Sequence, residues 1–345
     1  MIIPTRSFAG LLTLCVAVGA PGAFAQSTPS KDDTVTLSPF EVKAEENRGY
    51  VAAETLTGTR VATQIKDLPY TVNVITSEFF EDFAMFQLDD TLTQVGGLTG
   101  LDVGGGFNLR GFASSSQLRD GFYRQGRYGQ TNIDRVEVIK GPNAGIYGRS
   151  SPGGMVNMIS KSPQKSETQK LTVRGGSFGT LQGTLEATGK IGSPKTYYIA
   201  VFSQLNRGGD VDYFHIRENQ AYVALKHDFD NGGHFLFSAE HFKQYRHSQQ
   251  SAAPMITDQK GTASNLDDEA IGYAKNLARY QAYGPQSENS RSADTLRATY
   301  DRQLSDVFTF RAGAQLFSAK LQNFNANTGF GAVTINSTNA ASNLT

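Results

Sequence analysis

The sequence has almost no cysteine and no excess of charge of either sign. Of 345 residues one is cysteine, Cys15, and none is tryptophan. A chain with a single thiol has no disulfide framework, which excludes a small secreted scaffold held together by disulfides. Lysine plus arginine and aspartate plus glutamate both number 32, so there is neither a net basic field for nucleic acid nor an acidic tail. We therefore expect no nucleic-acid partner.

Long apolar runs are confined to the N-terminus. Arg6 precedes the run "FAGLLTLCVAVGA", and Ala23 and Ala25 supply the small residues of a signal peptidase site. We predict a secretory signal over residues 1–25. Later in the chain no run of about 18 apolar residues occurs, which excludes a helical membrane span but not a membrane β-barrel. An exported chain without disulfides fits a bacterial envelope protein.

The next segments change from polar to mixed. Residues 26–34, "QSTPSKDDT", have the composition of a disordered tether. The following "VTLSPFEV" is short and extended, and Pro39 restricts it to the edge of a sheet. Residues 70–76 alternate like a strand and residues 77–95 have helical spacing. A small α+β unit is therefore expected from Tyr50 to about Gln164.

After Lys165 the pattern becomes long alternation of apolar and polar residues. The unbroken period of two in "TLQGTLEATGKI", residues 180–191, is the clearest case. Similar segments are 170–178, 196–206, 220–229, 234–242, 294–304 and 307–320. Strands of about ten residues separated by short turns and longer loops are typical of an outer-membrane barrel. The alternative, a soluble β-sandwich, predicts strands of about five or six residues.

The densest glycine cluster lies in "IKGPNAGIYGRSSPGGMVN", residues 139–157. The preceding "IDRVEVIKGP" reads as a strand that ends in a turn at Gly141-Pro142. The later glycines let the chain fold back closely, while Ile146, Tyr147, Met155 and Val156 supply core contacts. A phosphate-binding loop is excluded because the Gly-Lys-Ser/Thr element is missing.

Motifs for catalysis or metal binding are weak. "GGSFG", residues 175–179, matches Gly-x-Ser-x-Gly, but Ser177 leads into an alternating strand and not into a helix, so a hairpin turn is expected. "GGGFNLRG" lacks the βαβ context of a dinucleotide site. The five histidines have no close ligand spacing. We expect no enzyme activity, no cofactor and no metal site.

Three blocks in order carry a family resemblance: "NLRGF" (108–112), "RDGF" (119–122) and "IDRVEVIKGPNAGIYGRSSPGGMVNMISKSP" (133–163). They resemble the plug domain of TonB-dependent outer-membrane receptors, and the last is most similar to the ferric-siderophore branch. The resemblance implies an α+β plug over residues 50–165. It also implies that residues 166–345 form the N-terminal part of an antiparallel transmembrane β-barrel. About seven strand segments cannot enclose such a plug, because the family's barrels have roughly 22 strands. We therefore expect a truncated receptor.

The resemblance also implies partners and site residues. It implies TonB-dependent uptake of ferric siderophores across the Gram-negative outer membrane, with TonB as the energising partner. Receptors for another nutrient, such as a glycan or cobalamin, and a non-functional fragment stay open as alternatives. The expected TonB box lies in residues 26–49, and its extended backbone suits strand addition to the partner. Its residues are Val35, Thr36, Leu37, Ser38, Pro39, Phe40, Glu41 and Val42.

Arginine and aromatic side chains of the plug are the expected contacts to an anionic chelate. They are Phe107, Tyr123, Arg124, Arg127 and Tyr128. The expected cationic contacts from plug to barrel are Arg110, Arg135 and Lys140, with Arg110 buried and paired. An ion pair between Arg110 and Glu137 within the plug is the alternative.

Overall fold

A computed structural model describes most of the chain after residue 48. The predicted signal, tether and TonB box lie outside the described residues. Within the described part, no helix is both long and apolar enough to cross a membrane. The described residues are 49–55, 57, 62–99, 106–114, 117–124, 126, 129–142, 144–147, 151–247, 255–258, 269–273, 288–305 and 308–324.

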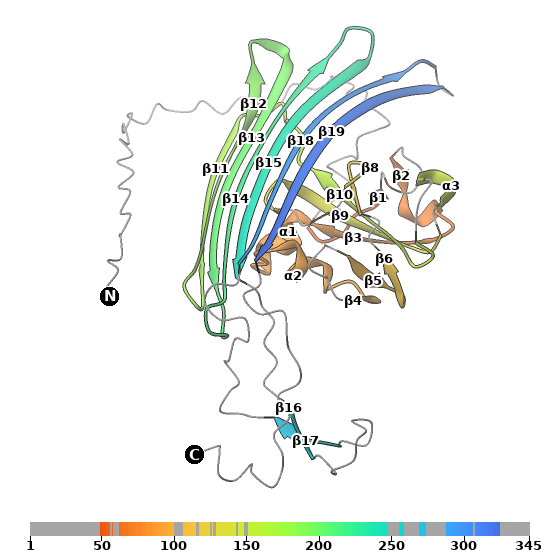
Figure 1. The fold of residues 1–345 in the computed structure, drawn as a ribbon. Coiled ribbons are helices and arrows are strands. Elements are labelled where there is room, and N and C mark those ends of the chain that lie inside the picture. Colours follow the sequence, from red (N-terminus) through yellow and green to blue (C-terminus); the bar gives the residue numbers. More distant parts are fainter. Residues whose placement is uncertain are drawn as a thin grey trace, which may run out of the picture. The chain divides into compact units, whose positions relative to one another are not determined.

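Seven strands form an antiparallel sheet, here called the long-strand sheet (Figure 1). Their order in the sheet follows the chain, and every neighbouring pair is antiparallel. This confirms the strands expected from alternation. The strands are β11 (Thr168–Gly176), β12 (Thr180–Ile191), β13 (Ser193–Gly208), β14 (His215–Asp228), β15 (Gly233–His247), β18 (Glu288–Gln303) and β19 (Thr309–Phe324).

The two faces of this sheet have inverted polarity compared with a soluble protein. On β12, Gln182 and Thr188 are buried, whereas Leu181 and Leu185 are 57% and 56% exposed. An apolar exposed face is costly in water and favourable in lipid. Alternation with apolar residues outside and polar residues inside is the pattern of a membrane barrel wall. The inverted polarity therefore supports the barrel over the soluble sandwich.

The connections between the long strands differ at the two ends of the sheet. One end holds the short connections at Gly192, 229–232 and 304–308. The other end holds the turn at 177–179 and the connections 209–214 and 248–287, and is here called the long-loop end. The connection 248–287 contains a small hairpin of β16 (Met255–Asp258) and β17 (Glu269–Tyr273). Barrels of the outer membrane carry their longer loops on the extracellular side.

The segment before the long strands forms a second, five-stranded sheet, here called the mixed sheet. Its order is β3-β9-β10-β7-β8, in which β10 and β7 are parallel and the other pairs antiparallel. Val136, Val138 and Met158 are fully buried in its core. The strands are β3 (Thr71–Thr76), β9 (Ile133–Lys140), β10 (Gly154–Ser160), β7 (Gln117–Arg119) and β8 (Phe122–Tyr123).

Helices and smaller hairpins complete this α+β unit. The helical spacing after Thr76 gives two short helices and not one, because Ala84 takes a left-handed conformation (φ 49°) between them. The first is capped by Thr76, whose side chain accepts from the amide of Phe79. The helices are α1 (Ser77–Asp82), α2 (Leu88–Leu92), α3 (Ala144–Tyr147) and the 3-10 helix η1 (Ile65–Asp67). The short strands are β1 (Glu54–Thr55), β2 (Thr63–Gln64), β4 (Leu98–Thr99), β5 (Phe107–Leu109) and β6 (Phe112–Ser114).

The glycine cluster allows a close backbone approach where β10 begins. Gly154 has φ 133°, a conformation that favours glycine. A methyl group on Gly154 would collide with the carbonyl oxygen of Ile139, and one on Gly153 with that of Leu109. The next residues, Met155 and Val156, are fully buried, as expected. The glycines therefore let β10 pack tightly against its neighbours.

Candidate functional site

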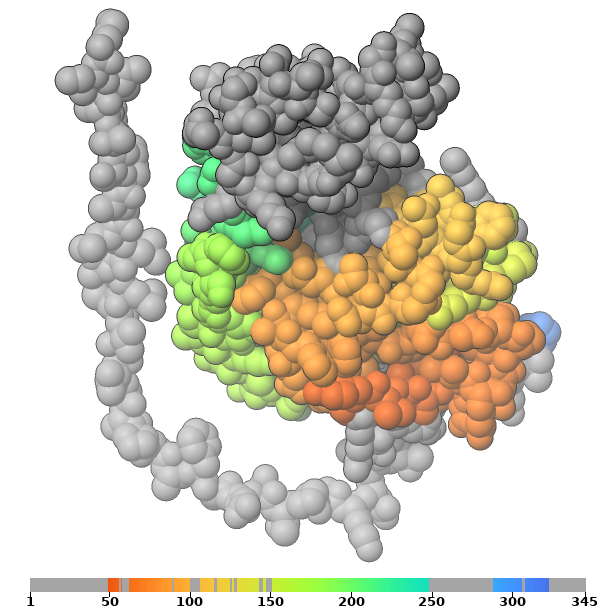
Figure 2. Space-filling model, turned by 90° about the horizontal axis from the view of Figure 1, so that it is seen from below, coloured from red at the N-terminus to blue at the C-terminus, as the bar shows by residue number. Residues whose placement is uncertain are grey.

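The polar face of the long-strand sheet contacts the mixed-sheet unit, and Figure 2 shows α1 and α2 in orange beside the light green strands. The contact contains a buried ion pair. Arg124, which follows β8, donates to Glu240 of β15 at 2.9 Å between Nη1 and Oε2. Nη2 of Arg119 lies 3.8 Å from the same oxygen, and both arginine side chains are fully buried. Two guanidinium groups thus bind one carboxylate between the sheets.

A second ion pair crosses the same contact beside the first. Arg297 of β18 donates to Asp120, in the turn between β7 and β8. The backbone amide and hydroxyl of Ser160 also donate to Asp120, at 2.7 and 2.5 Å. Burial raises the pKa of Asp120, but Arg297, Arg119 and the Ser160 hydrogen bonds outweigh it, so the pKa lies below its ordinary value. Asp120 is therefore held as a carboxylate.

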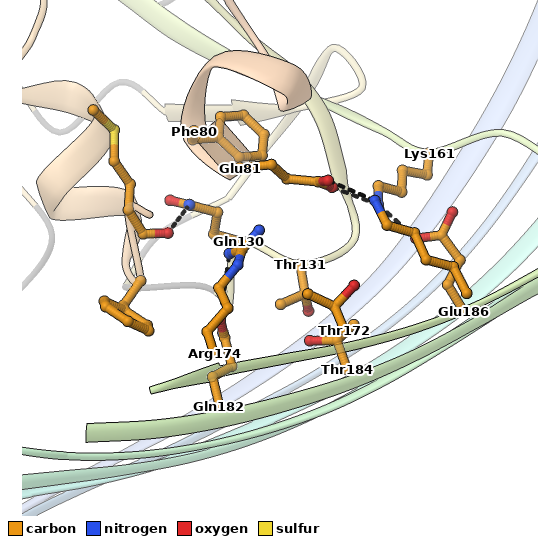
Figure 3. A pocket seen from close by; sticks show the side chains of 13 residues that line it. Phe80, Glu81, Gln130, Thr131, Lys161, Thr172, Arg174, Gln182, Thr184 and Glu186 are labelled. Atoms are coloured by element: carbon orange, nitrogen blue, oxygen red, sulfur yellow. Dashed lines mark hydrogen bonds and ion pairs between the residues drawn. The ribbon is translucent and has the colours of Figure 1, made fainter. Parts of the chain in front are cut away.

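A chain of alternating charges ties α1 to the first two long strands (Figure 3). Lys170 of β11 lies 2.5 Å from Glu81, and Lys161 lies 2.6 Å from Glu186 of β12 and 3.9 Å from Glu81. These residues line a small polar cavity of about 30 Å³. A cavity of that size has room for a bound water. This part of the contact is thus also held by charged side chains.

A larger cavity, of about 410 Å³, lies at the long-loop end and is here called the outer chamber. Arg207 of β13 forms an ion pair with Asp90 of α2 at 3.0 Å. The guanidinium of Arg246 stacks over the ring of Phe214 at 5.8 Å. Phe86 and Phe178 add two further rings to the lining. Guanidinium groups beside aromatic rings suit a ligand that is both anionic and aromatic.

The predicted ligand contacts are separated in the structure. Phe107 is 3% exposed and belongs to the core, so its expected role is corrected to packing. Arg124 is held by Glu240 inside the contact and is not a solvent-facing side chain. Tyr123 is 42% exposed and its carbonyl accepts from Gln315 of β19. Arg127 and Tyr128 lie outside the described residues.

The predicted cationic contacts also differ from expectation. Arg110 is exposed and lies with Gly111 in a tight turn between β5 and β6, at φ 54° and 82°. Because Arg110 is exposed, its expected buried position is wrong. Arg135 pairs with Glu137 of its own strand at 2.7 Å and with Asp134 at 3.3 Å. Lys140 is partly exposed at the end of β9.

Glu137 is instead the centre of a buried network on the mixed sheet. Its Oε2 accepts from the Thr55 hydroxyl at 2.6 Å and the Thr57 amide at 3.0 Å, and also from the Thr57 hydroxyl. Asn157 donates to the Thr57 hydroxyl at 2.8 Å. These bonds fix the N-terminal segment to β9 and β10. The alternative pair of Arg110 with Glu137 is therefore not formed.

Sequence reasoning missed most residues of the site. Glu240 and Arg297 lie on β15 and β18 and Asp120 in the turn between β7 and β8, and no sequence spacing links them. The sequence contains a weak signal for the outer chamber, because arginine and aromatic residues that line it cluster at strand ends in "NRGGDVDYFH" and "YRH". Among the described residues, no group of three or more histidine, cysteine or acidic side chains is arranged so that it could hold a metal ion. The "GGSFG" segment is a hairpin turn, as predicted, with the Thr180 amide bound to Ser177.

Comparison with known proteins agrees with this architecture. Residues 64–155 match the family model of the TonB-dependent receptor plug domain. The metal-pseudopaline receptor CntO of Pseudomonas aeruginosa is 32% identical over 188 residues, covering 51% of this chain and 27% of that protein. The ferrichrome outer membrane transporter/phage receptor of Escherichia coli K12 is 27% identical over 194 residues, covering 50% and 26%.

A solved structure shows the same fold. The ferric-catecholate import receptor Fiu of E. coli K12, in its open form, superposes with a TM-score of 0.68 at 22% identity. The match covers 79% of this chain and 42% of that receptor. The likeness therefore includes strands of the long-strand sheet as well as the mixed sheet. The chain spans less than half the length of each of these proteins.

Proposed function

We propose that this protein serves TonB-dependent uptake of ferric siderophores across the outer membrane, because residues 64–155 match the family model of the TonB-dependent receptor plug domain. The observation that carries the proposal is that buried ion pairs join a plug-type unit to the long-strand sheet, here also called the wall, whose outer face is apolar. Such a wall belongs in a bilayer. A plug held by polar contacts separates from the wall more readily than one held by an apolar core, because water replaces polar contacts at low cost.

The outer chamber supports a ferric chelate over a neutral glycan. It lies at the long-loop end, where a ligand from outside would arrive. Its two arginines offer charge-assisted hydrogen bonds to anionic oxygens. Its rings offer stacking to catecholate-type groups. The similarity to a metal-pseudopaline receptor and to a ferrichrome outer membrane transporter supports the same choice.

The N-terminal residues complete the proposed mechanism. The segment Val35–Val42 adds as an edge strand to a sheet of TonB, which pulls on the tether. The bonds from Thr55 and Thr57 to Glu137 are buried contacts that lie along that path. Release of the plug then opens a route past the buried polar face of the wall.

A binding titration tests the ligand class. Purified protein is titrated with a ferric catecholate, a ferric hydroxamate, cobalamin and a neutral oligosaccharide. We expect saturable binding of a ferric chelate and a loss of at least about tenfold in Arg246→Ala, because a charge-assisted bond contributes about 1.5–3 kcal/mol. Arg311→Ala is the control, since Arg311 pairs with Asp301 near the opposite end. Binding of only the oligosaccharide or cobalamin would reject the siderophore assignment.

A further inference from the structure

The outer chamber and the small polar cavity beside Glu81 share one side chain. The outer chamber measures about 410 Å³ and the small cavity, here called the inner cavity, about 30 Å³. Phe86 lines both of them, and Figure 3 shows the inner cavity. It lies in the segment between α1 and α2 and is partly exposed. One aromatic ring of the mixed-sheet unit therefore lies on the boundary between the two cavities.

The register of β11 and β12 locates this boundary on the wall. Gly176 of β11 is opposite Thr180 of β12, and both line the outer chamber. The next inward-facing pair along the two strands, Arg174 and Gln182, lines the inner cavity. A methyl group on Gly176 would lie 3.7 Å from Cζ of Phe86. The Phe86 ring thus reaches the wall at the glycine, where the outer chamber ends and the inner cavity begins.

The lining of the inner cavity is polar, with one more cation than carboxylates. The cations are Lys161, Lys170 and Arg174, and the carboxylates are Glu81 and Glu186. The two lysines are paired with the two carboxylates at 2.5 and 2.6 Å, so Arg174 is the cation in excess. Its Nη1 lies 3.5 Å from a neutral amide oxygen on β12. Guanidinium groups donate charge-assisted hydrogen bonds to anionic oxygens, so the cavity suits an anionic ligand.

We propose that the inner cavity is a second anion subsite and that Phe86 is the gate that separates it from the outer chamber. The proposal rests on the proposed function, because it takes the outer chamber as the place where an anionic chelate first binds. Movement of the Phe86 ring joins the two cavities and presents Arg174 to an anion in the chamber. The closed cavity has room for a water molecule, so a large anion also requires α1, which carries Glu81, to move. The subsite thus receives the anion as the plug begins to leave the wall.

Thiol labelling of the purified protein tests the gate without siderophore or TonB. Cys15→Ser removes the one cysteine, and Thr184→Cys then places a thiol in the lining of the inner cavity. The probe is the anionic reagent sulfonatoethyl methanethiosulfonate. We expect Phe86→Ala to raise the labelling rate of Thr184→Cys by about tenfold or more, because minor open states are typically populated at about 0.1–10%. Ser177→Cys is the matched control, since Ser177 lines the outer chamber, and Phe86→Ala should leave its rate unchanged.

A second reagent tests the charge of the subsite. In Phe86→Ala, the anionic reagent should label Thr184→Cys about fivefold faster than the cationic trimethylammonium analogue, as for unit charges about 4 Å apart in water. Both rates are taken relative to those with a small free thiol. Arg174→Gln should remove most of this preference. Arg311→Gln should not, because Arg311 pairs with Asp301 near the opposite end of the wall.

Circular dichroism reports whether each variant folds. Phe86→Leu keeps an apolar side chain, should give an intermediate labelling rate, and decides if the alanine variant does not fold. Equal rates at Thr184→Cys with and without the Phe86 ring, an equal gain at Ser177→Cys, or no preference for the anionic reagent would overturn the proposal. None of these outcomes involves a siderophore, so failure of the gate and failure of the proposed function are distinguished.

Discussion

At the scale of single residues, the contact between the plug-type mixed-sheet unit and the long-strand sheet depends on buried charges. Arg124 and Glu240 are 2% and 6% exposed. A buried charge is tolerated only with a partner, and loss of one partner leaves the other uncompensated. The pair therefore holds the plug in one position as long as both members are present.

The first prediction concerns this pair. Arg124→Ala should destabilise the contact by about 3–5 kcal/mol, because it leaves Glu240 buried with only the more distant Arg119. The measurement is the urea concentration at which half of the protein becomes susceptible to protease cleavage within the plug. Lys195→Ala is the control, since its pair with Asp230 is exposed and such pairs contribute about 0–1 kcal/mol. Equal midpoints for Arg124→Ala and wild type would contradict the assigned role.

The second prediction concerns pH and Asp120. Its pKa is lower in the folded protein than in the unfolded chain, so its ion pair with Arg297 stabilises the fold at all pH values above about 4. That contribution is lost as the pH falls through the lowered folded-state pKa. Protease resistance of the plug should therefore decline below about pH 4 more steeply in wild type than in Asp120→Asn. An identical acid profile for the two proteins would refute this role of Asp120.

At the scale of secondary-structure elements, the tight start of β10 depends on glycine. Gly154→Ala places a methyl group against the Ile139 carbonyl in a backbone conformation that L residues rarely adopt. We predict a destabilisation of about 1–3 kcal/mol, measured by chemical unfolding. Gly145→Ala is the control, because nothing lies within 4 Å of the added atom. A Gly154→Ala protein as stable as the control would contradict this, because it would show that the backbone around Ile139 moves away from the added methyl group without a loss of stability.

Much of the secondary structure could be predicted from the sequence, and the errors in that prediction have physical causes. Alternation located β12 over its full length, because the lipid-facing and inward-facing residues differ strongly in polarity there. It placed the start of β18 at Asp294, whereas the strand begins at Glu288, since both faces near the long-loop end are polar. The single helix expected after Thr76 was wrong, because one left-handed residue breaks it.

The site was less predictable than the strands. Arg124 and Glu240 are 116 residues apart, so their pairing depends on how the two sheets meet. "NLRGF" suggested a buried arginine because its neighbours are apolar. The tight turn instead exposes Arg110 while Leu109 is fully buried.

At the scale of the whole molecule, polarity explains how one chain forms two different surfaces. The exposed apolar face of the long-strand sheet requires lipid, and its buried polar face requires a polar partner, which the mixed-sheet unit supplies through ion pairs. Polar contacts of this kind cost less to separate in water than an apolar core does. The chain covers 42% of a receptor with the same fold, so the remaining wall strands of that receptor have no counterpart in the match.

Uptake of a radiolabelled ferric siderophore by iron-limited cells that express the protein tests the central claim most directly. The same cells are compared with cells that lack TonB and with cells whose protein lacks Val35–Val42. We predict accumulation only where both TonB and the segment are present, while surface binding persists in all three strains. Equal accumulation without TonB, or without the segment, would contradict the account.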